Sequence, residues 1–372
     1  MTINSAPSVF PSPVRLDCQT FKAELNELAK SGFFRHALPA DVGGLGDGFS
    51  DLLSHHYQLG NSHRNAGFIL AVNAHLWGAV FPIFLYGDAL QRTLWLPKLM
   101  SGDWLAGHAI TEPGCGSDVQ AMQCEARLEG VNFVLNGEKK YITNVPFAEC
   151  LVVYAKLKGK ISAFLLSSKD SGCHFSDDAS LDACRGSVTG SVYLNDCRLN
   201  ANRLLGKPGA GSAMIQKALE YERAFVFAGI AGIMEWQLQE VIRYSRSRQS
   251  GGVHLGRHQA ISHRIADMKL RLDTLLLWLN ECARLCDTGK RLTLVSSQTK
   301  LYAAEAFLQS SLDAVQIFGA KGLETPSTML ELVQDALAGR LFSGSSEMQK
   351  NLIAALLGTG EAFHAKKPEL WP

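Results

Sequence analysis

Residues 110–118 read ITEPGCGSD and follow a short apolar run. One proline, two glycines and the hydroxyls of Thr111 and Ser117 are packed into this loop. Such a loop can present backbone N–H groups and hydroxyls to a phosphate or a polar heterocycle. It could equally be a tight connection, so the sequence around it has to decide between a binding loop and a plain turn.

The sequence changes character on either side of this loop. Residues 21–28 and 50–100 show helical patterning, as does the chain from residue 208 onward. Between residues 104 and 205, short β-type runs alternate with Gly, Asn and Asp, and Asn136-Gly137 is typical of a hairpin turn. The predicted order is therefore helices, a small antiparallel β domain, and helices again.

Composition excludes several classes of protein. The 372 residues are 47% hydrophobic and carry a net charge of +1, which favours neither nucleic acid nor an anionic membrane as a partner. No uninterrupted apolar run of membrane-spanning length is apparent. The first residues lack a secretory signal pattern, and nine scattered cysteines suggest reduced thiols, so a cytoplasmic protein is expected.

Other candidate motifs favour structural roles. The glycine-rich segment 206–211 fits neither a P-loop nor the dinucleotide-binding spacing, and reads as a hinge before the next helix. Cys115 reads as a small buried thiol. The spacing of the histidines predicts packing or surface roles and no metal site, as for His55, His56, His75 and His258.

One carboxylate stands out in the helix after residue 208. Glu222 occupies a gap in an apolar stripe at helical spacing, formed by Ile215, Ala218, Phe225, Gly229 and Ile233. A carboxylate on a core-facing stripe is paired, protonated or functional. Burial in general strengthens a carboxylate as a proton acceptor, so Glu222 is a candidate general base. Arg223 is adjacent in sequence, but neighbours on a helix point different ways, so it is no automatic partner.

The loop at 110–118, together with NGEKKYITN at 136–144, resembles the flavin-binding domain of the acyl-CoA dehydrogenase family. The similarity extends over nearly the whole chain. It implies an α+β fold of that type, with an N-terminal helical domain (1–105), a central antiparallel β domain (106–207) and a C-terminal four-helix bundle (208–372). It also implies FAD as cofactor.

The resemblance assigns flavin contacts by position. These positions are Thr111, Gly116, Ser117, Tyr141, Thr143, Arg248, Gln316, Gly319, Ser345 and Glu347. Tyr141 stands where Trp is commoner, Gly251 where the family has Phe, and Ala320 where it has Gly. In the family, the positions of Arg248 and Gln316 serve a flavin shared between subunits, so a homodimer or homotetramer is expected.

The resemblance also implies an acyl thioester as substrate, carried by coenzyme A or a carrier protein, with an unidentified electron acceptor. Ser117, Arg223 and Gly344 match substrate-binding positions. Most members carry the catalytic Glu where this chain has Ser343. Members such as isovaleryl-CoA dehydrogenase carry it on the helix of Glu222 instead, in a Glu-Arg pair. Ser343 retains a backbone N–H that can polarise the thioester carbonyl.

Three functional hypotheses follow. The first is FAD-dependent α,β-dehydrogenation of an acyl thioester with Glu222 as base. The second is a specialised biosynthetic oxidation of a carrier-protein-bound acyl group. The third is a flavin-binding protein without dehydrogenase activity. The segment 346–349 has the spacing of a capping box, which places a helix N-terminus beside Ser343, where it would favour the negative charge of an enolate.

Overall fold

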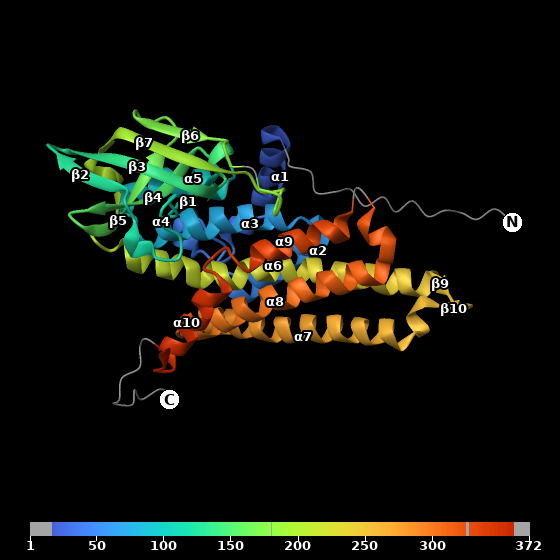
Figure 1. Ribbon diagram of the computed structural model, residues 1–372. Helices are drawn as coiled ribbons and strands as arrows, with labels where there is room; N and C mark the ends of the chain where they lie inside the picture. The colour runs from blue at the N-terminus through green and yellow to red at the C-terminus, as the bar shows by residue number, and fades with distance from the viewer. Residues whose placement is uncertain (1–16, 180, 325–326, 361–372) are drawn as a thin grey trace.

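The computed structural model describes residues 17–179, 181–324 and 327–360. Helices come first, then a sheet, then long helices. In Figure 1 the sheet lies at one end of the long helices, and α3 lies between the sheet and α6. The N-terminal elements are α1 (Cys18–Lys30), α2 (Phe49–His63), α3 (Ala66–His75), the π-helical η3 (Leu76–Val80), α4 (Phe81–Tyr86) and α5 (Ala89–Met100).

The central sheet has eight strands in the order β6-β7-β3-β2-β4-β5-β8, with β1 added beside β4. Its pairs are antiparallel except β1–β4 and β2–β4, which are parallel. The strands are β1 (Ala106–Ala109), β2 (Glu125–Glu129), β3 (Asn132–Thr143), β4 (Cys150–Leu157), β5 (Lys160–Ser167), β6 (Cys173–Ser176), β7 (Thr189–Asn200) and β8 (Leu204–Leu205).

Long helices form the C-terminal part and pack on one another and on α2. They are α6 (Gly211–Ser247), α7 (Gln259–Asp287), α8 (Thr293–Phe318), α9 (Thr328–Gly339) and α10 (Ser346–Leu356). A small ribbon links α6 to α7, formed by β9 (Gln249–Ser250) and β10 (Val253–His254). Short 3-10 turns fill the connections: η1 (Phe33–Arg35), η2 (Ala40–Val42), η4 (Val119–Ala121), η5 (Val145–Phe147), η6 (Ala201–Arg203), η7 (Leu255–Arg257) and η8 (Gly319–Leu323).

Helices α2 and α6 approach so closely that glycine is required at their contact. A Cβ on Gly60 would lie 1.8 Å from the carbonyl oxygen of Gly229, and one on Gly232 would lie 2.0 Å from that of Tyr57. Real Cβ atoms do not come this near to backbone atoms, so a side chain at either position would force the helices apart. The N-terminal helices are thereby locked onto the helix that carries Glu222.

One sequence-based expectation was wrong. Asn136-Gly137 is not a hairpin turn: β3 continues through it, with a register shift between Leu135 and Gly137. The turn between β2 and β3 falls instead at Gly130, whose φ is 60°. Ala66–Tyr86 is a separate case: it is long and apolar enough to cross a membrane, yet 89% of its most apolar window is buried inside the protein. It is packed as a core element because the sheet and α6 cover it.

His75 links three elements at this core. Its Nε2 donates to the carbonyl of Leu99, and its Nδ1 accepts from the backbone N–H of Ala106 at the start of β1. This pattern requires a neutral imidazole. Complete burial lowers the pKa of His75 from 6.5 to about 4, against the smaller opposing effect of the Leu99 carbonyl.

Acid should therefore weaken the fold. Between pH values of about 6.5 and 4, the unfolded chain binds a proton at His75 that the native chain does not, so the free energy of unfolding falls as the pH falls. We expect His75→Gln, whose amide can replace both hydrogen bonds, to lose less stability than the wild type between about pH 7 and about pH 5. Thermal unfolding followed by circular dichroism checks this, and equal losses in both proteins would contradict it.

Candidate active site

Glu222 and Ser343 meet in space although they lie far apart in the sequence. Glu222 projects from α6 and is only 4% exposed, as predicted from its place in the apolar stripe. The hydroxyl of Ser343 donates to Oε1 of Glu222 at 2.6 Å. The other oxygen, Oε2, is buried and accepts no hydrogen bond within the described part of the protein. The carboxylate therefore keeps one oxygen available to take a proton.

The backbone around Ser343 is held in a left-handed turn. Ser343 has φ 54° and Gly344 has φ 88°. Nε of Arg223 donates to the Ser343 carbonyl at 3.1 Å, and Nε2 of Gln349 donates to the Gly344 carbonyl at 3.0 Å. Arg223 is thus directed to this turn and not to the Glu222 carboxylate, and burial lowers the pKa of its guanidinium. The Ser343 N–H bonds to no acceptor among the described residues, so it remains available to a substrate carbonyl.

Helix α10 begins directly after this turn. Its N-cap is Ser345, whose side chain accepts from the backbone N–H of Met348 at 3.3 Å. The sequence pattern had suggested Ser346 as the capping residue, and that was wrong: Ser346 is the first helical residue. Glu347 lies exposed in the first turn. The helix N-terminus therefore lies beside Ser343, as expected, and favours negative charge there.

A histidine that sequence reasoning overlooked completes the cluster. His108 lies on β1, and its Nε2 is 3.5 Å from Oε2 of Glu222. The sequence did contain a signal for it, because a lone imidazole interrupts an otherwise apolar run three residues before Thr111. The strand that carries His108 continues into the glycine-rich loop, so Glu222 and that loop belong to one region.

Lys300 was also overlooked. It lies on α8, is fully buried, and donates from Nζ to the carbonyl of Arg340 at 3.2 Å, just before the Ser343 turn. Burial lowers its pKa to about 7, and the nearby Arg223 cation adds to that effect. The signal for it was a lysine in a stretch of small and apolar residues. Its hydrogen bond anchors the same turn that Arg223 holds.

The glycine-rich loop is built around a buried ion pair. Glu112 accepts from Nζ of Lys139 at 2.8 Å and from the backbone N–H groups of Gln123 and Cys124. Burial alone would raise the pKa of Glu112, but these hydrogen bonds lower it overall. Cys115 is buried, as predicted. The pair fixes the loop and leaves its glycines at the surface.

The two predicted flavin motifs lie side by side. The backbone N–H of Lys140 donates to the carbonyl of Thr111 at 2.9 Å, so the loop borders β3 just before Tyr141. Tyr141 lies in a bulge of β3, with φ 58°, and its side chain is 54% exposed. Thr143 is half-buried two residues later, while Gly116 and Ser117 are exposed. Bulges of this kind re-aim side chains at functional sites.

The structure does not bring every predicted residue together. Arg248, Gln316 and Gly319 are exposed. Arg248 follows the end of α6, and because a helix rises about 1.5 Å per residue, the length of α6 from Glu222 to that end is roughly 40 Å. Figure 1 shows β9, which begins next to Arg248, at the end of the helices remote from the sheet. Within one chain, Arg248 therefore cannot share a ligand with the loop at Thr111.

Models of one protein family match almost the whole chain. The acyl-CoA dehydrogenase N-terminal domain matches residues 13–103, the middle domain 107–197 and the C-terminal domain 209–358. The chain belongs to the acyl-CoA dehydrogenase family. It is accordingly an FAD-dependent oxidoreductase that dehydrogenates acyl thioesters or carrier-protein-bound acyl groups. This sets aside the hypothesis of a flavin-binding protein without activity.

Two curated relatives and one solved structure are similar to this chain over most of its length, and they differ in the substrates for which they are named. An L-prolyl-[peptidyl-carrier protein] dehydrogenase of Pseudomonas fluorescens is 32% identical over 87% of each chain. The mitochondrial isovaleryl-CoA dehydrogenase of Arabidopsis thaliana is 33% identical over 93% of this chain and 86% of its own. The structure of PigA with FAD and proline superposes with a TM-score of 0.88 at 28% identity, covering 93% and 90% of the two chains.

The residues of the loop and the bulge fit the cofactor of an acyl-CoA dehydrogenase. A Cβ added at Gly114 or at Gly116 would meet nothing within 4 Å, so the loop borders open space. Beside it, the exposed ring of Tyr141 offers a flat face, with Nζ of Lys140 at 5.6 Å from the ring centre. Open backbone, hydroxyls and an aromatic face suit a flavin. No group of three or more metal-ligating side chains occurs in the parts of the chain that the structure covers.

Proposed function

We propose that this protein oxidises a compact acyl group held as a carrier-protein thioester, with Glu222 as the base that removes the α-proton. The observation that supports this role is how the two oxygens of the Glu222 carboxylate are hydrogen-bonded. One oxygen of its carboxylate accepts the Ser343 hydroxyl, and the other is buried without a hydrogen bond among the described residues. A buried carboxylate with a free oxygen is suited to take a proton from carbon. The match to the carboxylate of isovaleryl-type enzymes supports this assignment.

Aromatic packing beside Glu222 favours a compact substrate. Tyr221 and Phe225 flank Glu222 on α6, and the fully buried ring of Trp77 lies 5.2 Å and 5.1 Å from their ring centres. Phe49 stacks on Tyr221 at 5.4 Å. We infer that these rings border the acyl group, and an interior packed at this density would leave no room for a long chain without displacing a ring. A short or cyclic acyl group requires no such displacement.

The residues of the chain divide the work around such a thioester. The free N–H of Ser343 is proposed to donate to the thioester carbonyl, and the N-terminus of α10 to stabilise negative charge there. Arg223 and Lys300 hold the turn that aims this N–H. The flavin, when bound along Thr111, Ser117, Tyr141 and Thr143, supplies the acceptor for the hydride leaving the β-carbon.

The names of the relatives separate two substrate classes. Prolyl groups on peptidyl carrier proteins are named for the bacterial relatives, and coenzyme A thioesters for the mitochondrial ones. A prolyl group is compact and cyclic, which agrees with the packing around Trp77. We therefore propose a prolyl-type aminoacyl thioester on a carrier protein, with short-chain acyl-CoA as the alternative favoured by the acyl-CoA relatives.

Anaerobic bleaching of the bound flavin tests this choice. We expect a prolyl thioester on a peptidyl carrier protein to bleach the flavin, and an octanoyl thioester on the same carrier to leave it oxidised, because the rings beside Glu222 exclude the longer chain. Bleaching by butyryl-CoA, a short-chain acyl-CoA, is measured for comparison. Bleaching by butyryl-CoA and by octanoyl thioesters, without bleaching by the prolyl thioester, would reject the proposed substrate class.

The proposed assembly is a homodimer or homotetramer. It rests on the position of Arg248, Gln316 and Gly319, which are exposed at a distance from the loop in their own chain. A cytoplasmic location also stays a prediction. It agrees with the state of the nine cysteines, all of which are free thiols.

A further inference from the structure

His108 is the histidine that lies beside the carboxylate of the proposed base. The buried His75 has both ring nitrogens in hydrogen bonds. The side chain of His108 is 14% exposed, yet its Nδ1 is buried and has no hydrogen-bond partner in the described residues. Its Nε2 lies 3.5 Å from Oε2 of Glu222, which is within the range of an ion pair. His36 and His63 also pair with a carboxylate and leave one buried ring nitrogen without a hydrogen bond among the described residues, so what sets His108 apart is that its carboxylate is the proposed base.

A specific feature of the backbone holds the ring in place. Gly78 lies in the π-helical segment η3, and a Cβ there would come within 2.9 Å of Cγ of His108 and 3.0 Å of its backbone nitrogen. Any side chain at position 78 would displace the imidazole. π-Helical segments are rare and occur frequently at functional sites. The imidazole is thus held between Gly78 and Glu222.

The charged side chains near Glu222 have other partners, which leaves the His108 imidazole beside its carboxylate. Arg223 is directed to the Ser343 carbonyl, and Lys139 is engaged with Glu112. The polar groups beside the Glu222 carboxylate are the Ser343 hydroxyl and the His108 imidazole. The two orphaned atoms, Nδ1 of His108 and Oε2 of Glu222, therefore belong to one small cluster. Histidine is the side chain that most readily takes up and releases a proton near neutral pH.

We propose that His108 is a second proton acceptor of this site, matched to a substrate with a protonated amine next to the oxidised carbon. This rests on the proposed prolyl-type substrate. Nε2 of His108 takes the proton from the ammonium nitrogen, Glu222 takes the proton from the α-carbon, and a hydride leaves the β-carbon for the flavin. The cationic substrate thus loses two protons and one hydride and becomes a neutral enamine thioester, so atoms and charge balance.

A substrate with an ammonium group beside the α-carbon requires both proton acceptors. An ordinary acyl thioester loses one proton and one hydride, for which Glu222 alone suffices. An ammonium group beside the α-carbon has to lose its proton before its lone pair can stabilise the new double bond.

A pair of matched substrates tests the proposal. The holoenzyme is mixed anaerobically with the N-acetylcysteamine thioester of proline or of cyclopentanecarboxylic acid, which has the same ring without the amine. We expect His108→Gln to slow flavin reduction by the prolyl thioester about tenfold or more, and to change reduction by the carbocycle by less than about threefold. His174→Gln, at an exposed position on β6, is the control and should match the wild type with both substrates.

Three other results would overturn this role of His108. Equal slowing with both substrates would show that His108 only positions Glu222, and no slowing with either would show that it is not needed; both results overturn the proposal. A wild type reduced by the carbocycle but not by the prolyl thioester would reject the substrate class itself, and the proposal with it. If His108→Gln loses FAD or unfolds, as judged by flavin content and melting temperature, His108→Asn replaces it in the same comparison.

Discussion

Glu222→Gln is expected to slow reduction of the bound flavin by about 10²-fold or more, the usual scale for a positioned general base. The amide keeps the shape of the side chain and can still accept the Ser343 hydroxyl, but it cannot take the α-proton. Substrate should still bind and perturb the flavin spectrum. Anaerobic stopped-flow mixing with the thioester that bleaches the wild type separates binding from reduction.

The matched control is Glu240→Gln. Glu240 is a buried carboxylate on the same helix, ion-paired with Arg243 near the other end of α6. It should leave reduction unchanged. Unchanged reduction in a folded, FAD-loaded Glu222→Gln protein would remove Glu222 from the mechanism. Adding Ser343→Glu to Glu222→Gln places a carboxylate at the commoner family position. We expect partial recovery at best, because Ser343 has a left-handed backbone that strains a larger side chain.

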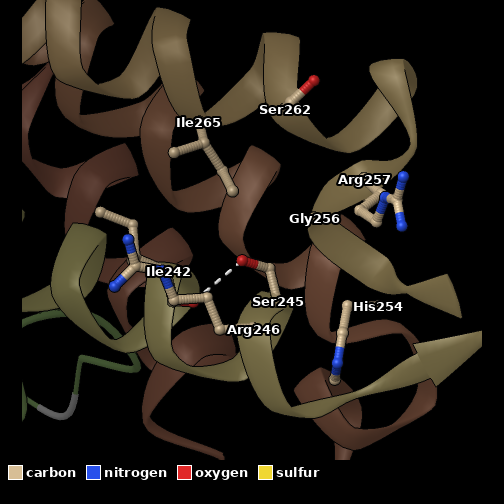
Figure 2. Close-up of a pocket in the computed structure, with 8 residues that line it drawn as sticks. All are labelled: Ile242, Ser245, Arg246, His254, Gly256, Arg257, Ser262 and Ile265. Atoms are coloured by element: carbon tan, nitrogen blue, oxygen red, sulfur yellow. Dashed lines mark hydrogen bonds between the residues drawn. The ribbon is translucent and has the colours of Figure 1, made fainter.

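Arg248→Ala is expected to weaken FAD binding by about tenfold or more, the equivalent of one charge-assisted hydrogen bond. Arg248 is exposed after the end of α6, roughly 40 Å along that helix from Glu222, so the flavin it would serve is that of a neighbouring subunit. A cavity of about 420 Å³ lies at this end of the helices. Figure 2 shows Arg246, His254 and Arg257 among the residues that line it. The charges of the two arginines make this end suitable for a pyrophosphate.

FAD titration of the apoprotein, followed by flavin fluorescence, measures the loss, and light scattering measures the assembly. Arg127→Ala is the control, because Arg127 is an exposed arginine on the sheet that pairs with Glu129 and Asp196. It should bind FAD as the wild type does. A wild-type protein that is monomeric and yet fully loaded with FAD would contradict the shared site.

The structure that the local sequence pattern predicts differs most from the observed structure in the β domain. Asn136-Gly137 has the composition of a hairpin turn, but its neighbours pair continuously with β7, and the two residues form a bulge. Sheet pairing over many residues outweighs the local preference of two. Similarly, Ala66–Tyr86 has the composition of a membrane helix and is instead buried by the sheet and by α6. In both cases, partners distant in the sequence decided the outcome.

The sequence by itself determined the order of helices and sheet, the glycine-rich loop at 110–118 and the buried place of Glu222. These depend on periodicity and on contiguous motifs, which a single chain displays directly. Only the tertiary structure brought Ser343 to Glu222 across 121 positions of sequence, turned Arg223 toward the Ser343 carbonyl, and set His108 beside the carboxylate. Such contacts form when elements distant in the chain pack together, and residue spacing carries no record of that packing.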